Sequence, residues 1–426
     1  MKILFLTQVL PYPLFGGAKV RAYYVLRYLA REHDITLVSF IRSDDQPEDL
    51  EHLREYCEQV HTIPIGRNRL KDILALIESF ITGQPAVVIR DRISGMRRLL
   101  KDLVLNEQYD VIHADQTSMA EYALFAQSQA DKIQLPKILL DEHNALHHVV
   151  QRQAEYEAGY SRWLYNREAG LLAKYERKLL RYFDHILTVT EEDRETLLKL
   201  FTDDEGSRIA QRMSVVPICI DTEAAAVVNQ AGERPQVVHL GTMFWPPNIE
   251  AVQWFTKEVL PLVIGQVPHV RFVIAGKDPP ASVRNLAGNK SEYGDWVDVL
   301  GFVREPDKLI AASQVFVVPV QAGGGMRVKI LDAWSWGIPV ISTTIGAEGI
   351  RIVPGKNILI ADDPNEFAAL VVRALLDKEL AARLVSEGRG WVSQHYNWQS
   401  TYKAVDEVYR QLVNRQVNSR NGGPDL

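Results

Sequence analysis

The chain of 426 residues has few cysteines and lacks any long apolar run. Its two cysteines, Cys57 and Cys219, form neither a metal-ligand pattern nor a disulfide framework. We therefore expect both to be reduced and buried in a cytoplasmic protein. No window approaches the ~20 consecutive apolar residues that a membrane span needs. We expect no membrane crossing, whereas contact with the inner face of a membrane remains open.

An excess of basic residues is also missing. Lys and Arg number 48 against 54 Asp and Glu, which leaves a net charge of -6 and argues against a broad nucleic-acid-binding surface. One basic cluster has two interpretations, a surface that binds anionic lipid or a solvated helix face. The acidic residues beside the cluster favour the solvated helix face. The cluster consists of Arg90, Arg92, Arg97, Arg98 and Lys101.

Several catalytic motifs are absent. The chain has no G-x-x-x-x-G-K-[ST], no G-x-S-x-G and no G-x-G-x-x-G, so P-loop hydrolysis, serine catalysis and a dinucleotide fingerprint lose support. His143 and His147 have a spacing that suits a metal, but no H-E-x-x-H arrangement accompanies them. We therefore expect no metal and no cofactor.

The chain does contain a regular alternation of β-branched runs and helical stretches. Such alternation predicts βαβ units and parallel sheets, and the length predicts two domains. The first series of expected strands is Lys2–Gln8, Asp34–Phe40, Val60–Ile65, Tyr109–Asp115, Lys137–His143, His185–Thr190 and Met213–Ile218. The second is Val237–Thr242, Val270–Lys277, Val297–Val303, Gln314–Val320, Pro339–Thr343 and Ile358–Asp362.

These series predict two doubly wound, Rossmann-like α/β domains facing across a cleft. We expect an N-terminal domain at 1–220, a linker at 221–235 and a second domain at 236–395. An amphipathic helix at 396–416 has no strand after it and is expected to pack back on the first domain, and 417–426 forms a polar tail. Ligands of such sheets bind at the carboxyl ends of the strands.

The most informative stretch is 314–349, which predicts a strand, a glycine loop, a helix and a second strand. The loop reads Gly323-Gly324-Gly325. Glycine amides can converge on an anion, and a helix N-terminus favours one. Arg327 and Lys329 add two positive charges there, so the pattern predicts a phosphate or diphosphate site. The competing interpretation has Lys329 paired with Asp332.

Other polar residues and glycines lie at predicted strand ends. Asp332 is either a simple helix-start carboxylate or an acceptor for ribose hydroxyls. His143 either contacts a sugar or is a hydrogen-bonded structural histidine. Glu348 is either an acceptor for sugar hydroxyls or a simple helix-start carboxylate. Gly16 and Gly17 follow the first strand. A glycine pair there is often only a turn, so by itself it is weak evidence for a binding loop.

Residues 319–349 resemble the signature of the retaining family 4 glycosyltransferases, which have the GT-B fold. The Gly16-Gly17 loop, the segment 215–221 and the closing helix at Trp398 support the resemblance. It implies a nucleotide-sugar donor, UDP- rather than GDP-linked, and a saccharide or lipid-linked acceptor, as in polysaccharide biosynthesis. It also implies that no metal is needed and that the acceptor attacks on the front face without a protein nucleophile, unlike retaining glycosidases.

The resemblance also implies roles for particular residues. Arg327 and Lys329 would stabilise the leaving diphosphate, and His143 would lie near the transferred sugar. The donor would be bound by Gly16, Gly17, Gly241, Thr242, Gly323, Gly324, Gly325, Met326, Asp332, Gly346 and Glu348.

Two departures from the family pattern stand out. Gly324 and Asp332 occupy positions where glutamates are common, and the loop 241–248 lacks the usual Arg and Lys. We interpret Arg327 and Lys329 as replacing that missing pair. The alternatives are a nucleotide-sugar epimerase or hydrolase of the same fold and a non-catalytic nucleotide-sugar-binding protein.

Overall fold

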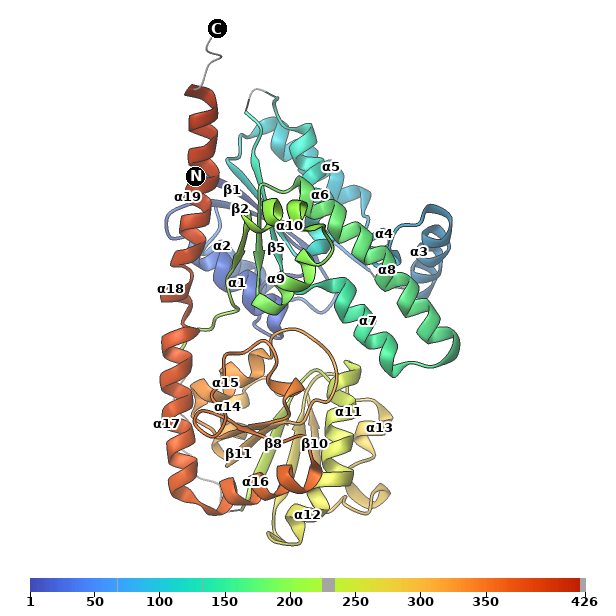
Figure 1. Ribbon diagram of the computed structural model, residues 1–426, viewed down its shortest axis with the longest axis vertical. Coiled ribbons are helices and arrows are strands. Elements are labelled where there is room, and N and C mark those ends of the chain that lie inside the picture. Colours follow the sequence, from blue (N-terminus) through green and yellow to red (C-terminus); the bar gives the residue numbers. More distant parts are fainter. Residues whose placement is uncertain (67, 133, 224–233, 422–426) are drawn as a thin grey trace. The chain divides into compact units, whose positions relative to one another are not determined.

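The computed structural model describes residues 1–66, 68–132, 134–223 and 234–421 (Figure 1). It divides into two compact units. Unit 1 comprises Met1–Cys219 together with Trp398–Leu426, and unit 2 comprises Ile220–Asn397. The chain therefore passes between the units twice, at Cys219/Ile220 and at Asn397/Trp398. Most of the linker expected at 221–235 lies outside the described residues.

Unit 1 is built on a seven-stranded parallel sheet with the strand order β3-β2-β1-β4-β5-β6-β7. Its first strand is buried along almost its whole length, as expected of a strand covered on both faces. The strands are β1 (Lys2–Thr7), β2 (Asp34–Ile41), β3 (Gln59–Pro64), β4 (Val111–Asp115), β5 (Lys137–Glu142), β6 (His185–Thr188) and β7 (Met213–Val215).

Helices connect these strands and cover the sheet. The long helical stretch after β5 forms two helices, α7 and α8. The helices of unit 1 are α1 (Gly17–Leu29), α2 (Pro47–Arg54), α3 (Arg69–Thr82), α4 (Ala86–Arg90), α5 (Ser94–Asn106), α6 (Thr117–Gln129), α7 (Leu146–Tyr156), α8 (Gly159–Tyr182), α9 (Glu191–Leu198), α10 (Asp203–Ala210), α18 (Trp398–Thr401) and α19 (Lys403–Asn421).

The closing helix belongs to unit 1, and it continues past the expected end at 416 to Asn421. Buried aromatic side chains connect it to the sheet. The Tyr409 hydroxyl lies 2.7 Å from Nδ1 of His113 on β4, and the backbone N–H of Cys219 donates to the Tyr402 hydroxyl at 3.1 Å. Tyr28 of α1 donates to Asp406 at 2.9 Å. Residues almost 300 positions apart in sequence therefore share one core.

Unit 2 is built on a six-stranded parallel sheet with the order β10-β9-β8-β11-β12-β13. The strands are β8 (Gln236–Leu240), β9 (Arg271–Ala275), β10 (Val297–Gly301), β11 (Val315–Val318), β12 (Val340–Ser342) and β13 (Leu359–Ile360). The helices are α11 (Pro246–Trp254), the π-helix η1 (Phe255–Val259), α12 (Leu260–Ile264), α13 (Ala281–Arg284), η2 (Gly288–Lys290), α14 (Pro306–Ala311), α15 (Val328–Trp336), η3 (Ile345–Ala347), α16 (Pro364–Leu376) and α17 (Lys378–His395).

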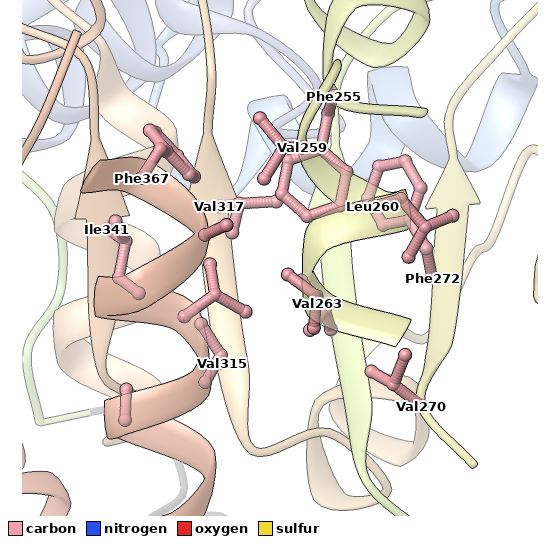
Figure 2. Close-up of a cluster of buried hydrophobic side chains, with 14 of the residues drawn as sticks. Phe255, Val259, Leu260, Val263, Val270, Phe272, Val315, Val317, Ile341 and Phe367 are labelled. Atoms are coloured by element: carbon pink, nitrogen blue, oxygen red, sulfur yellow. The ribbon is translucent and has the colours of Figure 1, made fainter. Parts of the chain in front are cut away.

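The core of unit 2 lies between this sheet and the helices α12 and α16 (Figure 2). The rings of Phe255 and Phe272 are 4.3 Å apart, and Phe367 meets Phe255 edge-on at 6.0 Å. The β-branched residues of β11 pack beside them, since both Val315 and Val317 are fully buried. This apolar packing fixes β8 and β11 as neighbours in the centre of the sheet.

Helix α15 is anchored by its apolar face. Trp334 is buried and its indole N–H donates to the carbonyl of Asn357 at 2.8 Å. A methyl group at Gly388 of α17 would lie 2.6 Å from the Trp334 ring, so only glycine allows this approach. Lys329 and Asp332, three positions apart, are less buried than their apolar neighbours and share the opposite face. The helix ends at Gly337, whose φ of 77° is left-handed.

No helix among the described residues is both long enough and apolar enough to cross a bilayer.

The contact between Tyr409 and His113 gives a test of the place of α19. Tyr409→Phe keeps the ring but leaves the fully buried His113 without its hydroxyl partner. We expect the free energy of unfolding of unit 1 to fall by about 1–3 kcal/mol in urea titrations. The control is Tyr182→Phe, because the Tyr182 ring is exposed. An unchanged midpoint for Tyr409→Phe would contradict this packing.

Candidate functional site

The loops after β8 and β11 meet where the topology of unit 2 reverses. These two strands are neighbours, and the crossovers that leave them run in opposite directions along the sheet. In doubly wound sheets, ligands bind at this point, outside the carboxyl ends of the strands. Gly241 and Thr242 follow β8 here, and the glycine loop follows β11. A hollow of about 490 Å³ at the opposite edge, beside Pro235 and Trp296, involves none of the predicted site residues.

Lys329 is the central charged group of this site. Its ammonium donates to Oδ1 of Asn248 at 3.0 Å and meets no carboxylate among the described residues. Burial, and then the charge of Arg327, lower the pKa of Lys329 to about 7. The predicted alternative, an ion pair with Asp332, is therefore wrong. A lysine with so low a pKa is poised to gain charge when an anion binds.

The backbone of Gly241 makes room for this lysine. A methyl group there would lie 2.7 Å from Nζ of Lys329 and 2.9 Å from Nδ2 of Asn248. Nδ2 of Asn248 in turn donates to the carbonyl of Thr242 at 3.0 Å. Beneath them, His239 is fully buried, and burial followed by the charge of Lys329 lowers its pKa well below the usual value. This imidazole is therefore neutral and adds no charge.

Arg327 precedes α15 and folds back over the glycine loop. Its Nη1 atom donates to the carbonyls of Gly324 and Gly325, the latter at 3.1 Å. Gly323 and Gly325 have left-handed φ values of 106° and 82°, which glycine adopts without strain. Met326 is half-buried beside them. No side chain caps the first turn of α15. The N–H groups of Val328 and Ile330 donate to backbone carbonyls at 3.2 and 2.9 Å, so the N–H of Lys329 is the group of this turn that remains available to an anion.

Asp332 lies on the same face of α15 as Lys329, one turn further on. Burial raises its pKa to about 7. No described residue donates a hydrogen bond to its carboxylate or forms an ion pair with it. A half-buried carboxyl group without a protein partner is suited to accepting hydrogen bonds from ligand hydroxyls.

In the turn after β12, the predicted donor-binding residue Gly346 has an N–H group that is already hydrogen-bonded. The N–H of Gly346 already donates to Oγ1 of Thr343 at 2.9 Å, and a methyl group at Gly346 would lie 2.4 Å from the Val318 carbonyl. Packing is therefore sufficient to require glycine at this position. Glu348 is half-buried at the end of η3.

The predicted residues of unit 1 lie around the corresponding reversal between β1 and β4. Gly16 precedes α1 with a φ of 97°, and neither it nor Gly17 receives a side-chain cap. The N–H groups of this first turn are therefore available to an anion.

His143 lies directly after β5 and is buried. Its Nε2 atom lies 2.8 Å from Oδ1 of Asp115, while Nδ1 has no partner among the described residues. Burial lowers the pKa of His143, but the carboxylates of Asp115 and Asp141 outweigh it and raise the pKa overall. A protonated imidazole here would present its Nδ1–H as a donor.

Asp141 connects this histidine to a buried ion pair that the sequence did not reveal. Nε and Nη2 of Arg21 donate to its two carboxylate oxygens at 3.0 and 3.1 Å. Asp115, Asp141 and His113 are close enough to hold a metal ion, but the guanidinium already occupies Asp141. His147 contacts Glu176 at 2.6 Å instead of sharing a ligand with His143. The His143/His147 spacing therefore does not form a metal site.

The sequence reasoning missed Asn248 and Asp115. Asp115 ends β4, so its position at a strand end was a usable signal. No signal in the sequence pointed to Asn248, because its contact with Lys329 joins residues 81 positions apart.

Two family models cover most of the chain. The model described as Glycosyltransferase Family 4 matches residues 15–224, and the model described as Glycosyl transferases group 1 matches residues 234–377. The chain belongs to the glycosyltransferase family that these two models together describe. The predicted enzyme class and the predicted GT-B fold, with two parallel-sheet domains, are thereby confirmed.

Relatives of this glycosyltransferase include proteins of different kinds. A Klebsiella pneumoniae protein described as an uncharacterized 44.6 kDa protein in cps region is 21% identical over 95% of this chain and 98% of its own. A GDP-mannose-dependent monoacylated alpha-(1-6)-phosphatidylinositol monomannoside mannosyltransferase of Corynebacterium glutamicum is 26% identical, over 33% of this chain and 39% of its own.

Solved structures share the fold of the glycosyltransferase. The sucrose-phosphate synthase of Thermosynechococcus elongatus has a TM-score of 0.67 at 18% identity, over 97% of this chain and 100% of its own. HepE of Anabaena, in a complex with UDP and glucose, has a TM-score of 0.63 at 14% identity, over 96% of this chain and 100% of its own.

The pKa of Lys329 predicts how the binding of a diphosphate depends on pH. A bound diphosphate favours the ammonium form, so binding above pH 7 must also take up a proton. We expect the affinity for UDP-glucose to be nearly constant below pH 7 and to fall by up to about tenfold per pH unit above it. Isothermal titration calorimetry at pH 6 to 9, with ~1 unit steps, measures this slope.

The control is Lys329→Met, which keeps the length of the side chain but cannot titrate. It should bind more weakly and lose the slope above pH 7. A slope that persists in Lys329→Met, or that is absent from the unaltered protein, would contradict the assignment.

Proposed function

We propose that this glycosyltransferase transfers a sugar from a UDP-sugar to a saccharide or lipid-linked acceptor with retention of configuration and without a metal ion. The observation that carries the proposal is the Lys329 ammonium, half-buried beside Arg327 with no carboxylate partner among the described residues. An ammonium group near a helix start without a carboxylate partner favours an anion there, and a diphosphate fits the charge and the position.

The residues of unit 2 would act mainly on the leaving group. Negative charge develops on the diphosphate as its bond to the sugar breaks, and the ammonium and backbone N–H of Lys329 together with Arg327 would stabilise it. This cationic set would serve in place of a metal ion. The carboxyl group of Asp332 would accept hydrogen bonds from the ribose hydroxyls.

Retention follows if the acceptor oxygen attacks the sugar from the face that the diphosphate leaves. The acceptor's proton then passes to a diphosphate oxygen, and no protein nucleophile is needed. His143, held by Asp115 and carrying an unpartnered Nδ1 atom, would contribute a hydrogen bond to the transferred sugar. Gly16 and Gly17 would offer N–H groups to the phosphates.

The nature of the donor and of the acceptor is supported by the relatives. HepE of Anabaena, which matches nearly the whole chain, was solved with UDP and glucose, and this favours UDP over GDP. The Corynebacterium glutamicum mannosyltransferase, whose name specifies a phosphatidylinositol monomannoside, favours a lipid-linked acceptor, although its name also specifies GDP-mannose and its match covers 33% of this chain. A role in polysaccharide biosynthesis is part of the proposal.

Replacement of Arg327 tests the leaving-group role. If the guanidinium stabilises the diphosphate, Arg327→Ala should lower kcat by about 10²–10³-fold. The matched control is Arg373→Ala, because Arg373 is an exposed arginine of α16 in the same unit. Thermal-shift screening against UDP-, GDP- and ADP-sugars first identifies the donor, since a tight ligand raises the unfolding temperature.

An unchanged kcat and donor KM in Arg327→Ala would contradict the role of this residue. Activity that disappears with EDTA and returns with a divalent cation would contradict metal independence. Incubation with donor alone separates the remaining alternatives, because rapid turnover without an acceptor indicates an epimerase or a hydrolase.

A further inference from the structure

Helix α3 exposes its apolar side chains instead of burying them. Only Ala75 and Ser79 of its fourteen residues are buried. Ile81 is 80% exposed and Leu70 is 65% exposed. The exposed large apolar residues are Leu70, Ile73, Leu74, Ile77, Phe80 and Ile81. Most of them recur at helical spacing, so they form an apolar stripe on the outer side of the helix.

The polar side chains of α3 hold this helix on the rest of unit 1. Asp72 pairs with Arg90 at 3.9 Å, and Glu78 pairs with Arg92 at 3.7 Å. Nη1 of Arg167, on α8, donates to Oγ of Ser79 at 3.0 Å. The helix is therefore attached through its polar side, which is the reverse of the usual arrangement on a globular protein.

Two arginines of the basic cluster 90–101 have a role other than the two alternatives considered from the sequence, a lipid contact and a solvated helix face. Arg90 and Arg92 are the partners of the α3 carboxylates, and Arg92 also donates to Glu121 at 2.7 Å. These two arginines hold α3 in place. The surface that they present is the apolar stripe of that helix.

Aromatic residues at the start of α8 extend the stripe. The ring of Trp163 stacks on Phe80 with centroids 6.1 Å apart, and Tyr160 stacks on Trp163 at 5.4 Å. Both residues are more than half exposed. Figure 1 shows α3 beside this part of α8 at the margin of unit 1. We call the exposed apolar residues of α3, together with Tyr160 and Trp163, the α3–α8 surface.

Cations without a carboxylate partner lie beside this surface. Arg69 and Lys71 are exposed in the first turn of α3, where Lys71 contacts only the carbonyl of Gly66 at 3.4 Å. Arg162, next to Trp163, donates to the carbonyl of Glu157 at 2.7 Å. None of the three forms an ion pair with a described residue. Their charges are left to interact with anions outside the protein.

We propose that the α3–α8 surface binds the interface of a membrane that contains anionic phospholipid. An amphipathic helix with a Leu/Ile face and flanking cations lies in the plane of such an interface. Trp and Tyr rings favour the headgroup level, and basic side chains are attracted to the negative surface potential. In a twofold contact between two copies, these cations would lie close to the same cations of the second copy and repel them. The charges therefore favour an anionic membrane over a second copy.

Vesicle flotation with the full chain tests this proposal. We expect the protein to float with phosphatidylcholine vesicles that contain phosphatidylglycerol, and less with phosphatidylcholine alone. Leu74→Gln/Ile77→Gln should weaken binding by more than about tenfold. Arg69→Gln/Lys71→Gln should weaken it by about 30-fold on the anionic vesicles only. The matched control is Leu300→Gln/Leu376→Gln, which removes two exposed leucines of unit 2 and should bind unchanged.

A second measurement places the contact on this surface. Lipids brominated on their acyl chains should quench the protein's tryptophan fluorescence, and Trp163→Phe should remove most of that quenching. The four altered residues of the first two variants are exposed, so thermal unfolding should match that of the unaltered protein. The proposal is overturned if the protein does not float, or if the control weakens binding as much. It is equally overturned if the protein is a dimer that Leu74→Gln/Ile77→Gln dissociates.

Discussion

The constraint on which the site depends is the placement of two positive charges at the start of α15. Lys329 meets the side-chain oxygen of Asn248 and no described carboxylate, although burial and Arg327 both disfavour its charged form. An uncompensated buried charge is costly, and the lowered pKa of Lys329 reflects that cost, so we propose that an anion completes the arrangement. The apolar anchoring of α15 by Trp334 and the absence of a Gly241 side chain keep the lysine at this place.

Unit 1 solves the same electrostatic problem within the protein. The guanidinium of Arg21 neutralises Asp141, and Tyr409 from the closing helix satisfies His113 beside it. Beside that network, Asp115 and His143 are within hydrogen-bond distance of each other at the carboxyl ends of β4 and β5. Here Nε2 of His113 and Nδ1 of His143 have no hydrogen-bond partner among the described residues, whereas in unit 2 the ammonium of Lys329 meets no described carboxylate. The difference is consistent with donor phosphates being held chiefly by unit 2.

Local patterns were sufficient for the strands, since the β-branched runs and their spacing predict every strand of both sheets to within a few residues. They also located the glycine loop, because glycines, a helix start and two cations lie together in sequence. Asn248 and Arg21 could not be found in this way, because their contacts depend on which strands become neighbours. The stripe of α3 has the spacing of a core-facing helix, and its outward orientation follows from the exposure of its apolar side chains and the ion pairs of Asp72 and Glu78 in the structure.

The most direct test of the account is a crystal structure with UDP bound. We expect the β-phosphate within hydrogen-bond distance of both Nζ and the backbone N–H of Lys329. The guanidinium of Arg327 should turn from the glycine carbonyls toward the phosphate, and the carboxyl group of Asp332 should accept the ribose hydroxyls. A UDP molecule bound elsewhere, with Lys329 still donating to Asn248 and Asp332 still without a partner, would contradict the account.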